Sequence, residues 1–275
     1  MLQTAAGFLF RLVPSSRRIV WRFWYQDLAR RFRDEDWVFM NYGFSPAGAA
    51  PYPLHLDATD EPDRYSIQLY DHVLGDADLR DANVLEVGCG RGGGSSFIRR
   101  YRRPRTVTGV DLSPANIAFC RQRHHLPGLR FLPGDAEALP FADDTFDAVV
   151  NIESSHCYGS MARFLAEVRR VLRPSGSFFF ADLRRVEGVG VLREHFRAAG
   201  LSARREETIT RNVLGAMDLD SQRKLALFKE RLPWPWNRIF RVFGGIPGTA
   251  VYESLRAGRR EYLCGVFGKA AAPSG

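Results

Sequence analysis

From residue 83 onward, short apolar runs alternate with amphipathic stretches, and this alternation limits the fold more than any other feature of the chain. Apolar strands that alternate with helices form parallel sheets with helices packed on both faces. The pattern therefore predicts an α/β fold built on a mostly parallel sheet. The expected strands are NVLEV (83–87), TVTGV (106–110), LRFLP (129–133), FDAVVNI (146–152), GSFFFADL (176–183) and REYLCGVFG (260–268).

The segments around these strands indicate how the chain is organised. Hydrophobic periodicity predicts helices at 60–74, 92–102, 113–124, 161–174, 189–200 and 217–230. Residues 41–63 and 233–248 are rich in glycine and proline and are expected to be irregular. We therefore expect an N-terminal cap (1–75), a core (76–216), a helical and loop insertion (217–258), and a final core strand with a tail (259–275).

The first expected strand runs into a glycine-rich turn, NVLEVGCGRGGGSS (83–96), which opens the next helix. Gly88, Gly90 and Gly93 match the dinucleotide pattern G-x-G-x-x-G, and Gly92 adds a G-x-G-x-G match. In such a turn the absent side chains let a ligand reach the backbone, and the helix N-terminus attracts a negative group. The turn predicts a site for either a dinucleotide or S-adenosylmethionine.

Acidic residues after successive strands help to separate these two ligands. Glu86 precedes the turn, where a carboxylate can meet the cationic amino-acid end of S-adenosylmethionine but is badly placed beside a pyrophosphate. Asp111 can accept both ribose hydroxyls, as an acid also does in NAD sites. Asp135 can accept the adenine amine, and Ala136 offers a backbone N–H. The structural alternatives are an ion pair for Glu86 and a turn for Asp135, but the order of the motifs favours S-adenosylmethionine. Apolar walls for the adenine are expected from Leu112 and Leu139.

Taken in order along residues 83–183, the motifs VLEVGCGRGGG, GVDLS, GDAEALPF, FDAVV and VRRVLRPSG resemble those of class I S-adenosylmethionine-dependent methyltransferases. DEPDRYSIQLY, RHHLPGLRFLPGDAEALPF, NIESSHCY and ADLR carry a narrower resemblance, to phthiotriolone/phenolphthiotriolone dimycocerosates methyltransferases and related fatty-acid O-methyltransferases. This resemblance fades at 233–258. It implies a Rossmann-like, doubly wound, mostly parallel seven-stranded sheet with an N-terminal helical cap and a C-terminal helical insertion. It also implies S-adenosyl-L-methionine as the cofactor. Cys89 and Asn151 complete the expected cofactor-binding residues.

Enzymes of these families methylate oxygen atoms on long lipids or polyketides, and a hydroxyl acceptor needs a base for its proton. His156 stands just past the fourth expected strand and Asp182 ends the fifth, so both are expected at the carboxyl-end edge of the sheet, where ligands bind. A carboxylate paired with an imidazole fixes its tautomer and stabilises the imidazolium. The stretch ESSH also resembles the E-S-x-H of natural-product sugar O-methyltransferases. His156 is therefore the expected general base and Asp182 its partner; the alternative for His156 is a polar residue that only lines the pocket.

The acceptor is expected to be a small lipophilic molecule that carries a hydroxyl. Pockets for such ligands are mostly apolar with a few polar anchors. The candidate pocket residues are Trp24, Tyr25, Tyr42, Tyr70 and Tyr158. The chain has no set of cysteines and histidines at zinc spacing, so no metal is predicted.

Charge and cysteine usage limit the partners and the compartment. The net charge of +8 comes mostly from scattered arginines, so nucleic-acid binding is not expected. The four cysteines lie far apart, which favours a reduced, cytoplasmic protein. Residues 16–33 read as a basic amphipathic helix that packs on the core as a cap or, alternatively, lies on a lipid surface and gives weak peripheral membrane association.

Four alternative functions stay open at this point. They are C-methylation of the quinone type, cyclisation of a polyketide by a methyltransferase fold, an NAD-dependent oxidoreductase, and a peripheral membrane-binding module without enzymatic activity. The acceptor's identity and the oligomeric state are not predicted from the sequence.

Overall fold

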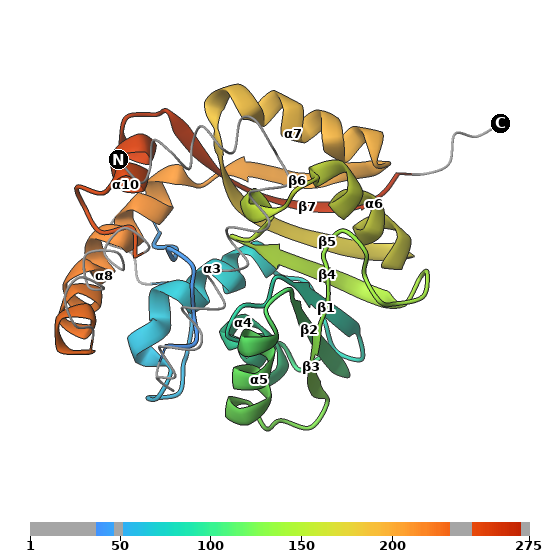
Figure 1. Ribbon diagram of the computed structural model, residues 1–275, viewed down its shortest axis with the longest axis horizontal. Coiled ribbons are helices and arrows are strands. Elements are labelled where there is room, and N and C mark those ends of the chain that lie inside the picture. Colours follow the sequence, from blue (N-terminus) through green and yellow to red (C-terminus); the bar gives the residue numbers. More distant parts are fainter. Residues whose placement is uncertain (1–36, 47–51, 232–243, 271–275) are drawn as a thin grey trace.

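Seven strands form one sheet in the order β3-β2-β1-β4-β5-β7-β6 (Figure 1). The computed structural model describes residues 37–46, 52–231 and 244–270. β1 to β5 pair in parallel, and β7 runs antiparallel between β5 and β6. This confirms the predicted doubly wound, mostly parallel α/β fold. The strands are β1 (Asn83–Val87), β2 (Thr106–Asp111), β3 (Leu129–Pro133), β4 (Phe146–Ile152), β5 (Leu172–Arg185), β6 (Leu201–Thr208) and β7 (Arg260–Lys269).

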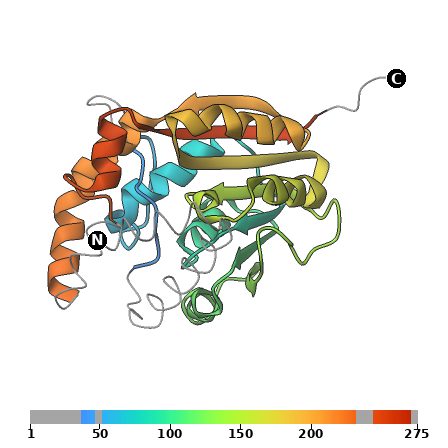
Figure 2. The same cartoon turned by 45° about the horizontal axis from the view of Figure 1, so that its top comes forward.

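Helices cover both faces of the sheet, because the buried strands are apolar on both sides. In β5, Phe178 and Phe180 pack with the apolar residues of α6 and α7, whereas the alternate residues Phe179 and Ala181 pack with those of α3, α4, α8 and α10. Figure 2 shows α10 beside α8 at one end of the sheet, and the two helices are in contact. The helices are α3 (Arg64–Leu74), α4 (Gly93–Phe97), α5 (Pro114–Arg123), α6 (Met161–Val171), α7 (Val186–Ala198), α8 (Thr210–Arg231) and α10 (Ala250–Arg256), with the short helical turns η1 (Glu61–Asp63), η2 (Ile98–Arg102) and η3 (Ser155–Cys157).

Serine caps fix the starts of two helices that follow the strands. The Ser113 hydroxyl accepts a hydrogen bond from the Asn116 amide at 3.3 Å, and α5 begins at the next residue, Pro114. The Ser160 hydroxyl accepts one from the Arg163 amide at 3.2 Å before α6. Such caps satisfy amides that have no partner inside the helix. They also hold the loops after β2 and β4 at the same edge of the sheet.

Three elements show how the structure departs from the sequence expectation. β6 was not among the expected strands, because it is a charged edge strand of which only Leu201 is buried. α6 ends at Val171 rather than at residue 174, since Arg173 precedes a proline and is disfavoured in a helix. α8 begins at Thr210, so the expected boundary at 217 falls inside a helix. The division into cap, core and insertion stays a prediction.

The expected helix at 16–33 and most of the loop at 233–248 lie outside the described residues. Within the part of the chain that is described, no helix combines the length and apolar character needed to cross a bilayer.

Candidate active site

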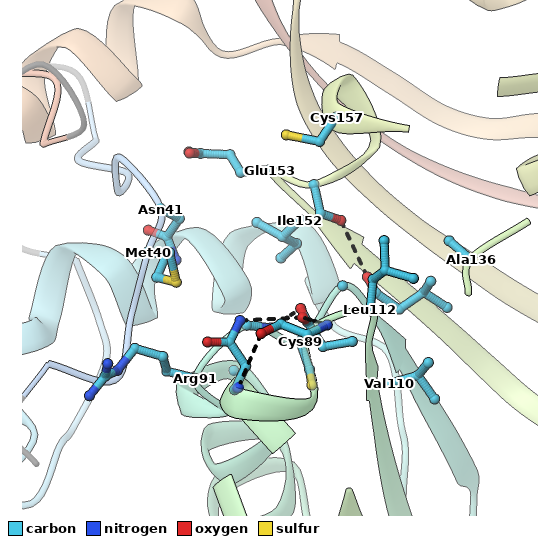
Figure 3. A pocket seen from close by; sticks show the side chains of 18 of the residues that line it. Met40, Asn41, Cys89, Arg91, Val110, Leu112, Ala136, Ile152, Glu153 and Cys157 are labelled. Atoms are coloured by element: carbon cyan, nitrogen blue, oxygen red, sulfur yellow. Dashed lines mark hydrogen bonds between the residues drawn. The ribbon is translucent and has the colours of Figure 1, made fainter. Parts of the chain in front are cut away.

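A large cavity opens at the carboxyl ends of β1, β2 and β4, with an empty volume of about 1090 Å³ that includes space open to solvent (Figure 3). It runs from the glycine turn and the loops after β2 and β3 to Glu153 and Cys157, and the segment 38–41 borders it from the other side.

The glycine turn presents its backbone to this cavity. Gly88 adopts a positive φ of 76°, and a Cβ there would lie 2.3 Å from the Ser154 hydroxyl, so no other residue fits. Gly92, at φ 81°, forms the N-cap of α4. At Gly90 a Cβ would meet only the Met40 sulfur, at 3.3 Å. That missing side chain leaves a backbone cradle that a ligand can enter.

Asp111 is held at the mouth of this cradle. Its Oδ2 accepts a hydrogen bond from the Gly90 amide at 2.9 Å, and its Oδ1 accepts one from the Ser113 amide at 2.8 Å. Burial raises the pKa of this carboxyl, while the hydrogen bonds from Ser113, Gly90 and Asn116 lower it. The structure thus brings Asp111 to the cavity wall in a fixed orientation, next to Leu112.

Glu86 does not line the cavity. It is 1% exposed, and its two carboxylate oxygens accept hydrogen bonds from the hydroxyls of Tyr70 (2.6 Å) and Ser95. Burial raises the pKa of Glu86 to about 7, against the lowering effect of these two hydroxyls. Tyr70, predicted as an acceptor-pocket residue, lines the cavity, and its hydroxyl binds Glu86 behind the cavity wall.

The remaining expected cofactor residues fall into two groups. Cys89, Asp135 and Ala136 line the cavity, and Asp135 also closes a turn by accepting a hydrogen bond from the Glu137 amide at 3.0 Å. Leu139 and Asn151 are buried and do not line it. The Asn151 side-chain nitrogen donates to the Val87 carbonyl oxygen at 2.9 Å, which ties β4 to the end of β1.

His156 and Asp182 form the expected pair. His156 lies on η3 just after β4, and its Nδ1 is 2.7 Å from Oδ1 of Asp182, three residues before the end of β5. Asp182 is fully buried, and its other oxygen accepts hydrogen bonds from the Ser155 hydroxyl (2.5 Å) and the His156 amide (2.9 Å). These bonds fix the orientation of the imidazole.

Each member of the pair stabilises the charged form of the other. Burial lowers the pKa of His156, but the nearby Cys157 and Asp182 side chains raise it well above its ordinary value. For Asp182, burial raises the pKa, but the charges of His156 and Arg184 hold it well below its usual range. The imidazole is 31% exposed and does not itself line the cavity, whereas its neighbours Cys157 and Tyr158 do.

Sequence reasoning missed Glu153, which lines the cavity three residues before His156. Its carboxylate accepts hydrogen bonds from the backbone amide of Tyr42 and from the hydroxyl of Tyr262. The available signal was its position directly after a buried parallel strand, where ligands bind. Tyr42, predicted as a pocket residue, contributes this amide but does not line the cavity. Trp24 and Tyr25 lie outside the described residues.

One group of possible metal ligands occurs among the described residues. The ligand atoms of His72, Glu207 and Cys264 lie within 4.8 Å of one another. However, the guanidinium of Arg205 lies 3.6 Å from the Glu207 carboxylate and 4.0 Å from the Cys264 sulfur. This cation already balances the acid, so the group is better explained as an ion-pair network.

Comparison with known proteins decides which ligand the glycine turn serves. Residues 85–180 match the methyltransferase domain family. The chain is 40% identical, over 91% of its length, to the phthiotriol/phenolphthiotriol dimycocerosates methyltransferase of Mycobacterium leprae (strain TN), 92% of which is covered. It is 38% identical, over 95% of its length, to the fatty-acid O-methyltransferase of Mycolicibacterium smegmatis, again with 92% covered.

The chain belongs to this methyltransferase family. The fold agrees, because it superposes on the geranyl diphosphate C-methyltransferase of Streptomyces coelicolor A3(2) with a TM-score of 0.63 at 18% identity, covering 92% of this chain and 98% of that one. That structure holds S-adenosyl-L-homocysteine. The methyltransferase uses S-adenosylmethionine, as the motifs predicted, and the NAD-dependent oxidoreductase is excluded.

Proposed function

We propose that this methyltransferase transfers a methyl group to a hydroxyl of a lipid, polyketide or other lipophilic natural product. The observation that carries the proposal is the 2.7 Å contact between His156 and Asp182 at the edge of the sheet that also bears the glycine turn. The names of the relatives give further support, since they refer to phthiotriol and phenolphthiotriol dimycocerosates and to O-methylation of fatty acids.

The cofactor-binding residues follow from the cradle. We assign the backbone of Gly88, Cys89 and Gly90, the carboxylates of Asp111 and Asp135, and the apolar side chains of Leu112 and Ala136 to cofactor binding, because all of them line the cavity. Gly92, also expected to bind the cofactor, is the N-cap of α4 and does not line the cavity. Glu86 and Asn151 do not line the cavity themselves but bind residues that do. Glu86 accepts a hydrogen bond from the Tyr70 hydroxyl, and the Asn151 side chain donates one to the Val87 carbonyl oxygen. When bound there, S-adenosylmethionine would supply a methyl group on a positively charged sulfur. An oxygen nucleophile can attack the methyl carbon, and the sulfur then leaves as a neutral thioether.

His156 is the group that removes the acceptor's proton. A neutral hydroxyl is a poor nucleophile, and a general base typically contributes a rate factor of about 10²–10⁴. With Nδ1 committed to Asp182, Nε2 is the nitrogen that receives the proton. The buried carboxylate then stabilises the imidazolium, in the way it does in hydrolase triads.

The direct test is incubation of the full-length protein with methyl-labelled S-adenosylmethionine and a panel of hydroxylated lipids, polyketides and glycosides. Mass spectrometry should find the label on an oxygen of a lipophilic acceptor. A label on carbon would replace the proposal with C-methylation, and an unlabelled rearranged product would indicate a cyclase. Binding of S-adenosylhomocysteine but not NADH should raise the melting temperature, because only a ligand of the native state stabilises it.

The N-terminal segment adds a second proposal about access to the acceptor. A basic amphipathic helix at 16–33 would bring the enzyme to the surface of a membrane that holds a lipid substrate. Co-sedimentation with anionic liposomes, with and without residues 1–33, tests this. Equal binding by both forms would remove the segment from the proposal.

A further inference from the structure

Glu153 occupies an unusual position at the acceptor end of the cavity. It follows β4 directly and lines the cavity wall, and its side chain projects into the space between Cys157 and the segment of Met40 and Asn41 (Figure 3). Its backbone adopts a left-handed φ of 48°, a strained conformation for residues other than glycine. The fold keeps this strain where the side chain faces the cavity.

The two oxygens of this carboxylate have different surroundings. Oε1 accepts two hydrogen bonds of 2.8 Å, from the Tyr42 amide and the Tyr262 hydroxyl, which belong to segments far apart in the chain. Oε2 has no hydrogen-bond partner among the described residues. The group is thus anchored through one oxygen and presents the other to the cavity. Burial raises the pKa of Glu153 to about 7, against the lowering effect of Tyr42 and Tyr262, so at pH 8 the presented oxygen is largely an acceptor.

A single hydroxyl cannot satisfy both His156 and Glu153. An alcohol has one O–H and therefore donates one hydrogen bond. If His156 takes that proton, as proposed above, Oε2 of Glu153 needs another donor. Glu153 lies three residues before His156 in the chain, just ahead of η3, and the charge of His156 lowers the pKa of Glu153.

We propose that Glu153 is a specificity-determining residue that binds a second hydroxyl of the acceptor, a few bonds from the hydroxyl that is methylated. This inference rests on the proposed function. It narrows the acceptor from any lipophilic alcohol to one with two neighbouring hydroxyls. A hydrogen bond to a charged group then favours a diol over the matching mono-alcohol by roughly 10- to 100-fold.

The test combines probes with variants of the full-length protein. The probes are 1-octadecanol, 1,2- and 1,3-octadecanediol, and 3-methoxy-1-octadecanol, in which the second donor is capped. The variants are Glu153→Gln and, as a matched control, Glu194→Gln on the exposed face of α7. In Glu153→Gln the amide oxygen can still accept from Tyr42 and Tyr262, while an amide donor replaces the free acceptor. Methyl transfer (kcat/KM) and binding to protein loaded with S-adenosylhomocysteine are both measured at pH 8.

We expect the wild type and Glu194→Gln to prefer one diol over 1-octadecanol by roughly 10-fold or more, and to treat the methoxy probe like 1-octadecanol. In Glu153→Gln the diol preference should fall toward one, with unchanged affinity for S-adenosylhomocysteine. Equal preference in wild type and Glu153→Gln, or no loss on capping, would overturn the proposal.

The two proposals fail in different ways. If the wild type transfers no methyl group to oxygen in any probe, the O-methylation proposal fails, yet calorimetry on the loaded protein still reports whether Glu153 prefers diols. If Glu153→Gln does not fold, the comparison of diol and capped diol on the wild type decides, because it needs no substitution.

Discussion

The two ends of the cavity are built differently. At the cofactor end, both oxygens of Asp111 already accept backbone amides, and the glycine turn offers main chain. At the proposed acceptor end, Glu153 lines the cavity and is anchored through one oxygen only. His156 lies outside the lining and is held by Asp182 through Nδ1, next to Cys157, which does line the cavity. In the assignment proposed above, backbone contacts prepare the cofactor end, whereas acceptor recognition depends on a side-chain oxygen of Glu153.

The largest effect is expected from removing the base. His156→Ala should lower kcat for O-methylation by about 10²–10⁴-fold, the usual contribution of a general base. Affinity for S-adenosylhomocysteine, measured by calorimetry, should stay unchanged because the imidazole does not line the cavity. Full activity in this variant would remove His156 from the chemistry and leave Glu153 as the candidate base.

At the cofactor end, a substitution should weaken cofactor binding and leave the preference among acceptors unchanged. Asp111→Ala removes the acceptor of the Gly90 and Ser113 amides and the predicted partner of the ribose. A lost hydrogen bond to a charged group corresponds to a roughly 10- to 100-fold weaker affinity for S-adenosylhomocysteine. The preference among acceptor alcohols should not change. A shift in that preference would show that the two ends are coupled.

The dependence on pH sharpens the same comparison. Because the pKa of His156 is raised well above its ordinary value, kcat/KM should fall up to about tenfold per pH unit below that pKa, where the imidazole is protonated. The free energy of unfolding should change in the opposite direction and decrease as pH rises. The protonated imidazole stabilises the fold below the unfolded-state pKa of about 6.5, and this contribution is lost as pH rises through the folded pKa.

The control for this pH effect is His156→Asn. In denaturant titrations, the free energy of unfolding of the wild type should decrease above pH 6.5 as His156 loses its proton. His156→Asn should not show this part of the decrease. If the free energy of unfolding depended on pH identically in the two proteins, the contact with Asp182 would not raise the pKa of His156.

The smallest effect is expected from a substitution on α7, away from both ends of the cavity. Arg197 and Glu194 form an exposed ion pair on α7, and such pairs contribute about 1 kcal/mol or less. Arg197→Ala should therefore leave activity, cofactor affinity and denaturation midpoint nearly unchanged. A large loss in this variant would show that α7 carries a function beyond covering the sheet.

Local patterns were enough to predict most of the core. Apolar runs located β1 to β5 and β7, and the glycine turn located one wall of the cavity, because both depend on neighbouring residues. β6 escaped because a charged edge strand lacks the apolar pattern of a buried one. The position of Glu86 also escaped, since its partners Tyr70 and Ser95 come from two different helices.

By itself the sequence determined the class of fold, the cofactor, and the pairing of His156 with Asp182, because strands of a parallel sheet bring their carboxyl ends to one edge whatever surrounds them. Only the tertiary structure decided which acids face the cavity. Glu86 and Glu153 both sit at or just after a strand's end, yet the first is enclosed by hydroxyls and the second lines the cavity. That difference arises from contacts between distant segments, including Tyr42 and Tyr262 around Glu153, which no local pattern encodes.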